Sequence, residues 1–156
     1  MGTSKSGRYL NTAGSGTSVS EYSLVHSNEG TFTKPSRKRD KLRLKGGGHG
    51  QDNIKLLEKY HIKYEITTTY KNGVRVGNVE GHKDRSKSIG NGQTWFPKNW
   101  TWRDIKHAGE HVASLKQNRH KPDGTKLIGW WKGVKVIVVK THGKIGTIFP
   151  DVNQKK

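Results

Sequence analysis

Residues 64–79 read YEITTTYKNGVRVGNV, and this stretch decides the fold class. Two runs, 64–70 and 74–79, alternate β-branched or aromatic residues with polar ones on either side of Asn72-Gly73. An Asn-Gly pair adopts the positive φ angles of a tight turn, and such alternation is typical of strands. The stretch therefore predicts an antiparallel hairpin.

Helical patterns lie on both sides of this hairpin. Residues 51–60 place Ile54 three residues before Leu57, with Asp52 in the first turn, which predicts a short helix. Thr101 followed by Asp104 resembles a capping box and opens the clearest amphipathic helix. Its apolar stripe recurs at spacings of three and four residues: Trp102, Ile105, Ala108, Val112 and Leu115.

The other expected elements are strands. Residues 21–26 are expected to form a short first strand, and Pro97 is expected to end a strand within TWFPKNW (94–100). Three more strands are expected, with turns between them, at 127–131, 134–140 and 144–150. The order of helix, hairpin, helix and strand meander predicts an α+β fold, in which an antiparallel β-sheet packs with two or more helices.

The composition narrows the class of partner. The 156 residues include 30 Lys and Arg against 12 Asp and Glu, a formal net charge of +18, which predicts a nucleic acid, an anionic membrane or an acidic protein as partner. No apolar run approaches a membrane span, and no signal-peptide core follows Met1. The absence of cysteine excludes disulfides and thiolate catalysis. We expect one domain at 21–156, preceded by a flexible linker or tail at 1–20 that is rich in Gly, Ser and Thr.

Two of the eight histidines lie in HAGEH (107–111), which fits the H-x-x-E-H pattern of inverted zinc peptidases. His107 and His111 could chelate one zinc ion, with Glu110 as the base. On a helical wheel, however, both histidines fall well to the side of the apolar stripe. No downstream acidic cluster offers a third ligand. Surface histidines are therefore the favoured interpretation over a zinc peptidase.

His49 lies in GGGHGQ (46–51), where glycine is the commonest residue. Glycine is costly to order, so this run is either a flexible turn or a place where backbone comes very close to another group. A helix is expected to start directly after it, and N–H groups at a helix N-terminus bind anions. We favour the second interpretation, in which the glycines let backbone N–H groups come close to a phosphate that also contacts His49. The run lacks the pattern of a nucleotide P-loop.

Metal-free cleavage of RNA needs one group to take the 2′-hydroxyl proton and another to protonate the leaving 5′-oxygen. It also needs a cation for the charge on the phosphorane. Two histidines and a lysine are sufficient. The partner of His49 is either His26, at the end of the expected first strand, or His82, which opens the basic loop 82–93.

Basic stretches at 34–45 and 82–93 provide candidate phosphate contacts, although a charge run can also be a solvated loop. Trp95 and Phe96 either anchor the end of the second stretch in the core, which we favour, or stack on bases. The candidate RNA-binding residues are Arg37, Lys38, Arg39, Lys41, Lys45, Lys83 and Arg85.

Four stretches together resemble the bacterial EndoU-type nuclease domains that form the C-terminal tips of polymorphic secreted toxins. They are KLRLKGGGHGQDNIKLLEKY (41–60), NGVRVGN (72–78), GQTWFPKNWTWRDI (92–105) and KIGTIFPD (144–151), within a resemblance that runs from about residue 21 to 154. It implies an α+β small-nuclease fold of the barnase-like and RelE-like (BECR) type. It also implies cleavage of RNA, often beside uridine, by 2′-OH transesterification to a 2′,3′-cyclic phosphate. No cofactor is expected to be required, and stimulation by Mn²⁺ is left open.

The resemblance also implies two catalytic histidines. His49 matches the histidine of the family's G-G-x-H element, which precedes a helix. The second histidine of the family lies upstream, so His26 is the match if residues 27–45 contain an insertion. Otherwise His82 takes its place.

A lysine and two threonines complete the implied site. The family's lysine precedes its S/T-F-F-P segment, which points to Lys87, with Lys83 as the alternative. Thr94 matches the Ser or Thr of that segment. Phe149 stands where the family has a tyrosine, so Thr147 is the candidate contributor there.

The partners follow from the same resemblance. It implies an RNA substrate, with tRNA among the candidates, and an acidic immunity protein that covers the site. It further implies a larger secreted parent protein whose tip acts in the cytoplasm of a target cell during interbacterial competition. The alternative is a module that binds RNA or DNA without cutting it. The two differ at His49, because a binding module tolerates its loss and a nuclease does not.

Overall fold

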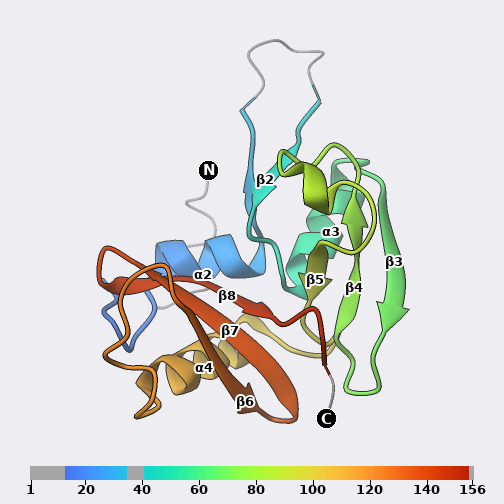
Figure 1. The fold of residues 1–156 in the computed structure, drawn as a ribbon. Helices are drawn as coiled ribbons and strands as arrows, with labels where there is room; N and C mark the ends of the chain where they lie inside the picture. The colour runs from blue at the N-terminus through green and yellow to red at the C-terminus, as the bar shows by residue number, and fades with distance from the viewer. Residues whose placement is uncertain (1–12, 35–40, 155–156) are drawn as a thin grey trace.

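The computed structural model describes residues 13–34 and 41–154, which form the predicted α+β fold (Figure 1). The helices of this part are α2 (Glu21–Asn28), α3 (Gln51–Lys59), the single 3-10 turn η1 (Arg85–Lys87) and α4 (Trp102–Ser114). Its strands are β1 (Thr31–Phe32), β2 (Leu44–Gly46), β3 (Tyr64–Thr69), β4 (Arg75–Val79), β5 (Gln93–Trp95), β6 (Lys126–Trp131), β7 (Val134–Thr141) and β8 (Lys144–Pro150). Within the described residues, these strands form three antiparallel sheets: β1-β2, β3-β4-β5 and β6-β7-β8.

The hairpin predicted from residues 64–79 is confirmed as β3 and β4, with Tyr64 opposite Val79. The turn spans residues 70–73, closed by the Gly73 N–H on the Tyr70 carbonyl at 2.9 Å, and Gly73 alone in it has a positive φ, 97°. β5 adds to β4 and ends just before Pro97, as expected. α3 packs beside this sheet and shares a small core with it, made of Leu44, Ile54, Leu57, Val79 and Trp95.

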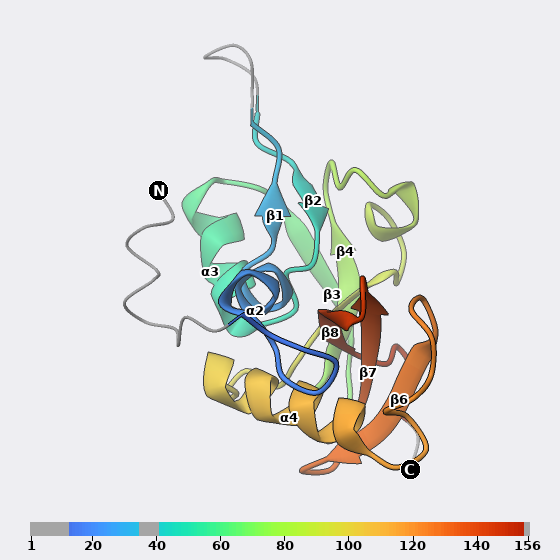
Figure 2. The same cartoon turned by 90° about the vertical axis from the view of Figure 1, so that its left-hand side faces the viewer.

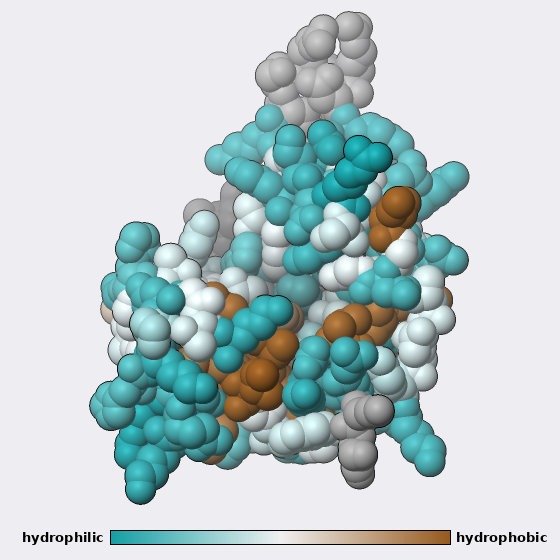
Figure 3. Space-filling model, viewed as in Figure 1, coloured by the Kyte–Doolittle hydropathy of each residue, from teal (hydrophilic) through white to brown (hydrophobic). Residues whose placement is uncertain are grey.

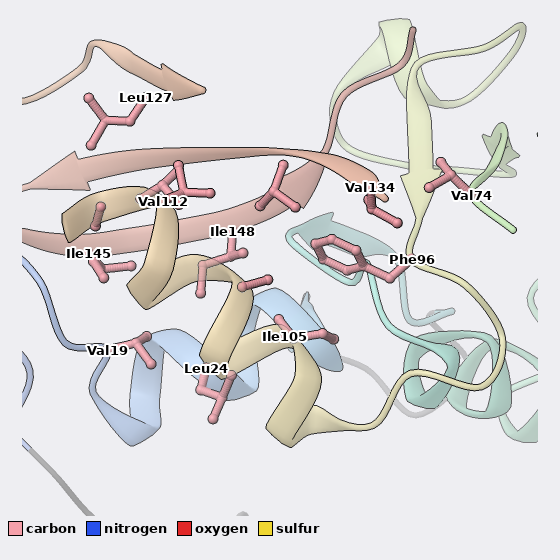
Figure 4. Packing of buried hydrophobic residues seen from close by; sticks show 14 residues of the cluster. Val19, Leu24, Val74, Phe96, Ile105, Val112, Leu127, Val134, Ile145 and Ile148 are labelled. Atoms are coloured by element: carbon pink, nitrogen blue, oxygen red, sulfur yellow. The ribbon is translucent and has the colours of Figure 1, made fainter. Parts of the chain in front are cut away.

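The predicted helix at Thr101 is confirmed as α4, and its capping box forms between Thr101 and Asp104. α4 lies against the meander β6-β7-β8 and buries Ile105, Ala108 and Val112 in the larger core (Figure 4). That core also takes Phe96, and both Phe96 and Trp95 are fully buried. The interpretation of these two rings as core anchors is therefore confirmed.

The first strand predicted at residues 21–26 is wrong, because this segment forms α2. Ser20 caps the helix by accepting a hydrogen bond from the Ser23 N–H. The buried face of α2 includes polar residues, Ser27 and Asn28, beside Leu24. Ser27 Oγ accepts from the backbone N–H of Ile148 at 3.0 Å. A helix whose buried face is partly polar leaves no apolar periodicity in the sequence, which is why the pattern was misread.

Of the tail expected at residues 1–20, residues 1–12 lie outside the described residues. Val19 is buried in the larger core, and its backbone N–H donates to Glu110 on α4 at 3.0 Å. The Ser15 carbonyl accepts from the N–H of Ile145. The described end of this stretch thus packs on the domain.

α2 joins the two halves of the molecule. Figure 2 shows it end-on between α3 and α4, with β1 and β2 above it and β6-β7-β8 to its lower right. β5 and β8 also meet, since the Thr94 hydroxyl donates to the carbonyl of Pro150 at 3.1 Å. The candidate site lies where these halves come together.

Candidate active site

The glycine-rich segment 46–50 lies against the C-terminal end of α2. The N–H groups of Gly48, His49 and Gly50 donate to the carbonyls of His26, Ser27 and Asn28, at 2.9, 2.6 and 3.0 Å. These carbonyls are the ones that a helix leaves without internal partners. The prediction that these N–H groups face a phosphate is therefore wrong: they hold His49 beside α2.

The glycines are required by this close approach. Gly47 has a φ of 65°, and a Cβ there would overlap the carbonyl oxygen of His26 and lie 2.9 Å from its Nε2. A Cβ at Gly46 would lie 3.3 Å from Cε1 of the same ring. A Cβ at Gly50 would overlap Asn28 Oδ1. The glycines thus allow segment 46–50, which carries His49, to lie directly against α2, which carries His26.

His49 is buried and fixed in one tautomer. Its Nδ1–H donates to the carbonyl of Thr94 at 2.7 Å, so Nε2 is the acceptor of the neutral ring. The ring of Phe149 packs on it, with centroids 5.5 Å apart. Burial, and next the positive charge of Lys87, lower the pKa of His49 from 6.5 to about 3. His49 is therefore neutral at physiological pH and can accept a proton at Nε2.

His26 faces the same space from α2. Its Nδ1 is 2.7 Å from Thr31 Oγ1, and the Nε2 side of its ring lies along Gly46 and Gly47. Burial, and next the charge of Lys87, lower the pKa of His26 from its ordinary value. His26 is partly buried, less deeply than His49.

Lys87 is the charge that connects these histidines. It ends η1 and lowers the pKa of both His26 and His49. The loop that carries it is folded tightly, since a Cβ at Gly92 would overlap the Ser86 carbonyl and lie 3.0 Å from the Lys87 Cα. No ion pair within the described residues involves Lys87. Its ammonium group is available to an anionic ligand.

His82, the other candidate partner of His49, is buried beside Lys87 and Asp84. Its Nδ1 accepts from the backbone N–H of Asp84 at 2.8 Å, which leaves the ring proton on Nε2. That atom is buried without a hydrogen-bond partner in the described structure. Burial, and next the charge of Lys87, lower the pKa of His82 to about 4. His82 is not among the residues that line the cavity described next.

Five of the predicted residues meet at one cavity of about 540 Å³, which we call the histidine cavity. Its polar lining includes His26, His49, Lys87, Thr94 and Thr147. Its apolar wall comes from β7 and β8, over which Figure 3 shows hydrophobic residues bordered by hydrophilic ones. The residues of that wall are Ile137, Val139, Phe149 and Pro150.

The two threonines differ in what they can do. Thr94 is buried, and its hydroxyl already donates to the Pro150 carbonyl, so it holds β5 and β8 together beside His49. Thr147 is half-buried on β8, and its hydroxyl has no hydrogen-bond partner among the described residues. Thr147 is therefore the one that can donate to a ligand.

Two further residues of this region carry no motif that would have revealed them. Lys126, the first residue of β6, lines the cavity with an exposed side chain. Gln93 is buried, and its amide donates to the carbonyls of Gly48 at 2.8 Å and Gly47 at 3.3 Å. The only signal for Gln93 is its position next to Thr94.

The candidate RNA-binding residues fall in two groups. Arg37, Lys38 and Arg39 lie outside the described residues. Lys41, Lys45, Lys83 and Arg85 all have exposed side chains. The loop that carries the last two lies beside β2, since the Lys83 N–H donates to the Leu44 carbonyl at 2.9 Å.

The zinc-peptidase motif does not form a site. His107 and His111 are exposed on α4. Across residues 13–34 and 41–154, no three His, Asp or Glu side chains are grouped so that they could hold a metal ion. The same residues contain no helix with the length and apolar character of a membrane span.

Comparison with known proteins gives one result. The family model described as bacterial EndoU nuclease matches residues 20–152, which is most of the chain. No curated protein and no solved structure matches it.

Proposed function

This chain belongs to the bacterial EndoU nuclease family, and we propose that it is an endoribonuclease that cleaves RNA by transesterification of the 2′-hydroxyl. The observation that carries the proposal is the convergence of His26, His49 and Lys87 on one cavity from three separate segments. Two imidazoles and one free cation are the groups that this chemistry needs.

His49 is the proposed general base. Its Nδ1–H is held by the Thr94 carbonyl, so Nε2 is free to take the proton of the 2′-hydroxyl. Its low pKa keeps this nitrogen unprotonated at neutral pH. The nucleophile then attacks the adjacent phosphorus within the same RNA strand.

His26 is the proposed general acid. It is less buried than His49, and a bound phosphate raises the pKa of a neighbouring imidazole by offsetting the charge of Lys87. The imidazolium keeps one N–H on Thr31 Oγ1 and gives the proton of Nε2 to the leaving 5′-oxygen. The 2′,3′-cyclic phosphate is the product.

Lys87 and Thr147 complete the proposed site. The Lys87 ammonium stabilises the additional charge of the phosphorane, and the Thr147 hydroxyl donates to a phosphate oxygen or to the base. No step requires a metal ion. The effect of Mn²⁺ is therefore a separate measurement on the same protein.

The biological role is also a proposal. The motifs resemble the tips of polymorphic secreted toxins, so we propose that this nuclease domain acts in the cytoplasm of a target cell as the tip of a larger parent protein. An active nuclease must be blocked in its producer. A net charge of +18 suits an acidic immunity protein as the blocking partner.

The proposal is tested by incubating the protein with total RNA, in EDTA and with added Mn²⁺, and by analysing the new RNA ends. We expect cleavage in EDTA with cyclic phosphate ends. The His49→Ala variant should leave the RNA intact, whereas His111→Ala, an exposed histidine of α4, should cut normally. RNA that stays intact at low salt with the unmodified protein would refute the proposal.

A further inference from the structure

A second cavity of about 540 Å³ has neither His26 nor His49 in its lining. It is formed by the residues before β2, the end of α3, the turn into β3 and the end of β4, which Figure 1 shows together in the upper part of the molecule. We call it the basic cavity. Its lining carries four cationic side chains, Lys41, Arg43, Lys59 and Lys63, against the single carboxylate of Glu80.

These cations are available to a ligand. None of the four takes part in an ion pair within the described residues. Arg43 is oriented by a hydrogen bond from Nε to the Gly81 carbonyl at 2.7 Å, which leaves its terminal nitrogens free. A fixed guanidinium beside several lysines is an arrangement that binds phosphate.

An aromatic ring is held in the same lining. Tyr60 is 38% exposed, and its ring packs edge-on against Phe32 with centroids 5.5 Å apart. This contact fixes the ring and leaves part of it exposed, and the Lys59 ammonium lies over the ring at 5.9 Å from its centroid. Aromatic rings of this kind stack on nucleobases without regard to sequence.

The backbone at the end of α3 supports a role for the side chains there. His61 has a φ of 59°, and its N–H and that of Ile62 close the helix on Glu58 and Leu57. Glycine is preferred at such a position, because other residues are strained in the left-handed conformation. His61 lines the basic cavity in spite of this strain.

The two cavities are neighbours through His82. Gly81 lines the basic cavity, and the next residue, His82, has its pKa lowered by burial and then by Lys87 and Arg43. Lys87 lines the histidine cavity, whereas Arg43 lines the basic one. The strand β2 also joins them, since Arg43, just before it, lines the basic cavity and Gly46, its last residue, lines the histidine cavity. A polyanion that occupies one cavity can therefore continue along β2 toward the other.

We propose that the basic cavity is a second binding site for single-stranded RNA, which takes a base on Tyr60 and the adjoining phosphates on Arg43 and Lys63. The inference rests on the proposed function for the identity of the polymer. It assigns this cavity to substrate affinity and not to the cleavage step. An acidic protein is the weaker candidate, since the fixed ring provides a stacking surface that carboxylates do not need.

The binding test uses a fluorescently labelled single-stranded RNA with 2′-O-methyl groups, which lacks the nucleophilic hydroxyl. Tyr60→Ala should weaken binding about tenfold, whereas Tyr60→Phe should keep the affinity of the unmodified chain. Lys59→Ala/Lys63→Ala should weaken it more than Lys116→Ala/Lys121→Ala, which removes the same charge from exposed positions outside the basic cavity. Cleavage of a dinucleotide should be equal in all of these variants.

Other outcomes overturn the inference. If the two double variants lose RNA affinity equally, the lysines of the basic cavity contribute only through the overall charge of the chain. If Tyr60→Ala keeps its RNA affinity, no base stacks on Tyr60. Loss of poly-glutamate binding on Tyr60→Ala with unchanged RNA binding would assign the cavity to an acidic protein. The proposed function fails separately, through intact natural RNA, because the uncleavable RNA still measures the basic cavity.

Discussion

Two cavities of equal volume, about 540 Å³ each, differ in how deeply their basic side chains are buried. In the histidine cavity, burial and Lys87 hold His26 and His49 in the neutral form. In the basic cavity, the lysines are exposed to solvent. A buried neutral imidazole can move a proton near neutral pH, whereas an exposed ammonium can only attract a phosphate. The comparison separates the residues expected to set the rate from those expected to set the affinity.

The largest effect is expected from His49→Ala. Loss of a general base lowers the rate of RNA cleavage by roughly 10²- to 10⁴-fold. The affinity for uncleavable RNA should stay within about twofold, since most phosphate contacts come from other residues. The measurements are kcat on a dinucleotide and Kd by fluorescence anisotropy. If His49→Ala lowers the affinity as strongly as the rate, the histidine cavity determines binding as well as cleavage, and the proposed separation of the two is wrong.

Lys87→Ala is expected to have the next largest effect. It removes one of the two lysines that line the histidine cavity, the one proposed to stabilise the phosphorane, and should lower kcat by roughly 10²-fold. Because the charge of Lys87 lowers the pKa of His26 and His49, its removal should also raise both pKa values, which NMR titration measures. Lys83→Ala removes an equal charge from an exposed neighbour and serves as the control. If the two variants lose kcat equally, Lys87 is not the lysine specific to catalysis.

A glycine pair tests how each cavity is built. Gly47 and Gly81 both have positive φ, and each lines one cavity. A Cβ at Gly47 would overlap the His26 carbonyl, whereas one at Gly81 would meet Arg43 Cγ at 3.9 Å, an ordinary contact. We expect Gly47→Ala to cost about 3 kcal/mol or more, and Gly81→Ala about 1–2 kcal/mol from backbone strain alone.

Urea denaturation of both alanine variants measures this difference in the free energy of unfolding. Similar costs would mean that the segment next to His26 can relax. The stability of the histidine cavity would then not depend on the close approach of segment 46–50 to α2.

The sequence specified the elements whose patterns are local. The Asn72-Gly73 hairpin and the Thr101 capping box are complete within a few residues, and both are confirmed. α2 was misread because its buried face contains Ser27 and Asn28, whose partners lie far along the chain. The period of apolar residues cannot show a helix that packs through polar contacts.

The same limit applies to the site. The glycines around His49 indicated a close approach, but the approaching group is α2, which the sequence does not identify. The choice between His26 and His82 also depends on tertiary structure. His26 reaches the histidine cavity because α2 replaces the expected strand, whereas the turn to Asp84 holds His82 behind Lys87.

The last effect concerns pH and the buried histidines. The pKa values of His49 and His82 are about 3 and about 4 in the folded chain, below the ordinary value of 6.5 that applies when the chain unfolds. The unfolded state therefore binds more protons than the folded state between pH 6.5 and these values. Stability should fall as the pH drops through this window. At pH 4 we expect Tm to be about 10 °C or more below its value at pH 7.

His82→Gln sharpens this last test, because it removes one titrating group outside the histidine cavity. Its Tm should depend less on pH than that of the unmodified chain. Asp84, whose pKa is lowered by hydrogen bonds from Ser86, contributes in the same direction and remains in the variant, so only the difference between the two chains is attributed to His82. His61→Gln, at an exposed histidine of the basic cavity, serves as the matched control. Equal slopes for the His82 and His61 variants would mean that burial does not hold His82 neutral, and the contrast between buried and exposed groups would then apply to His49 and His26 alone.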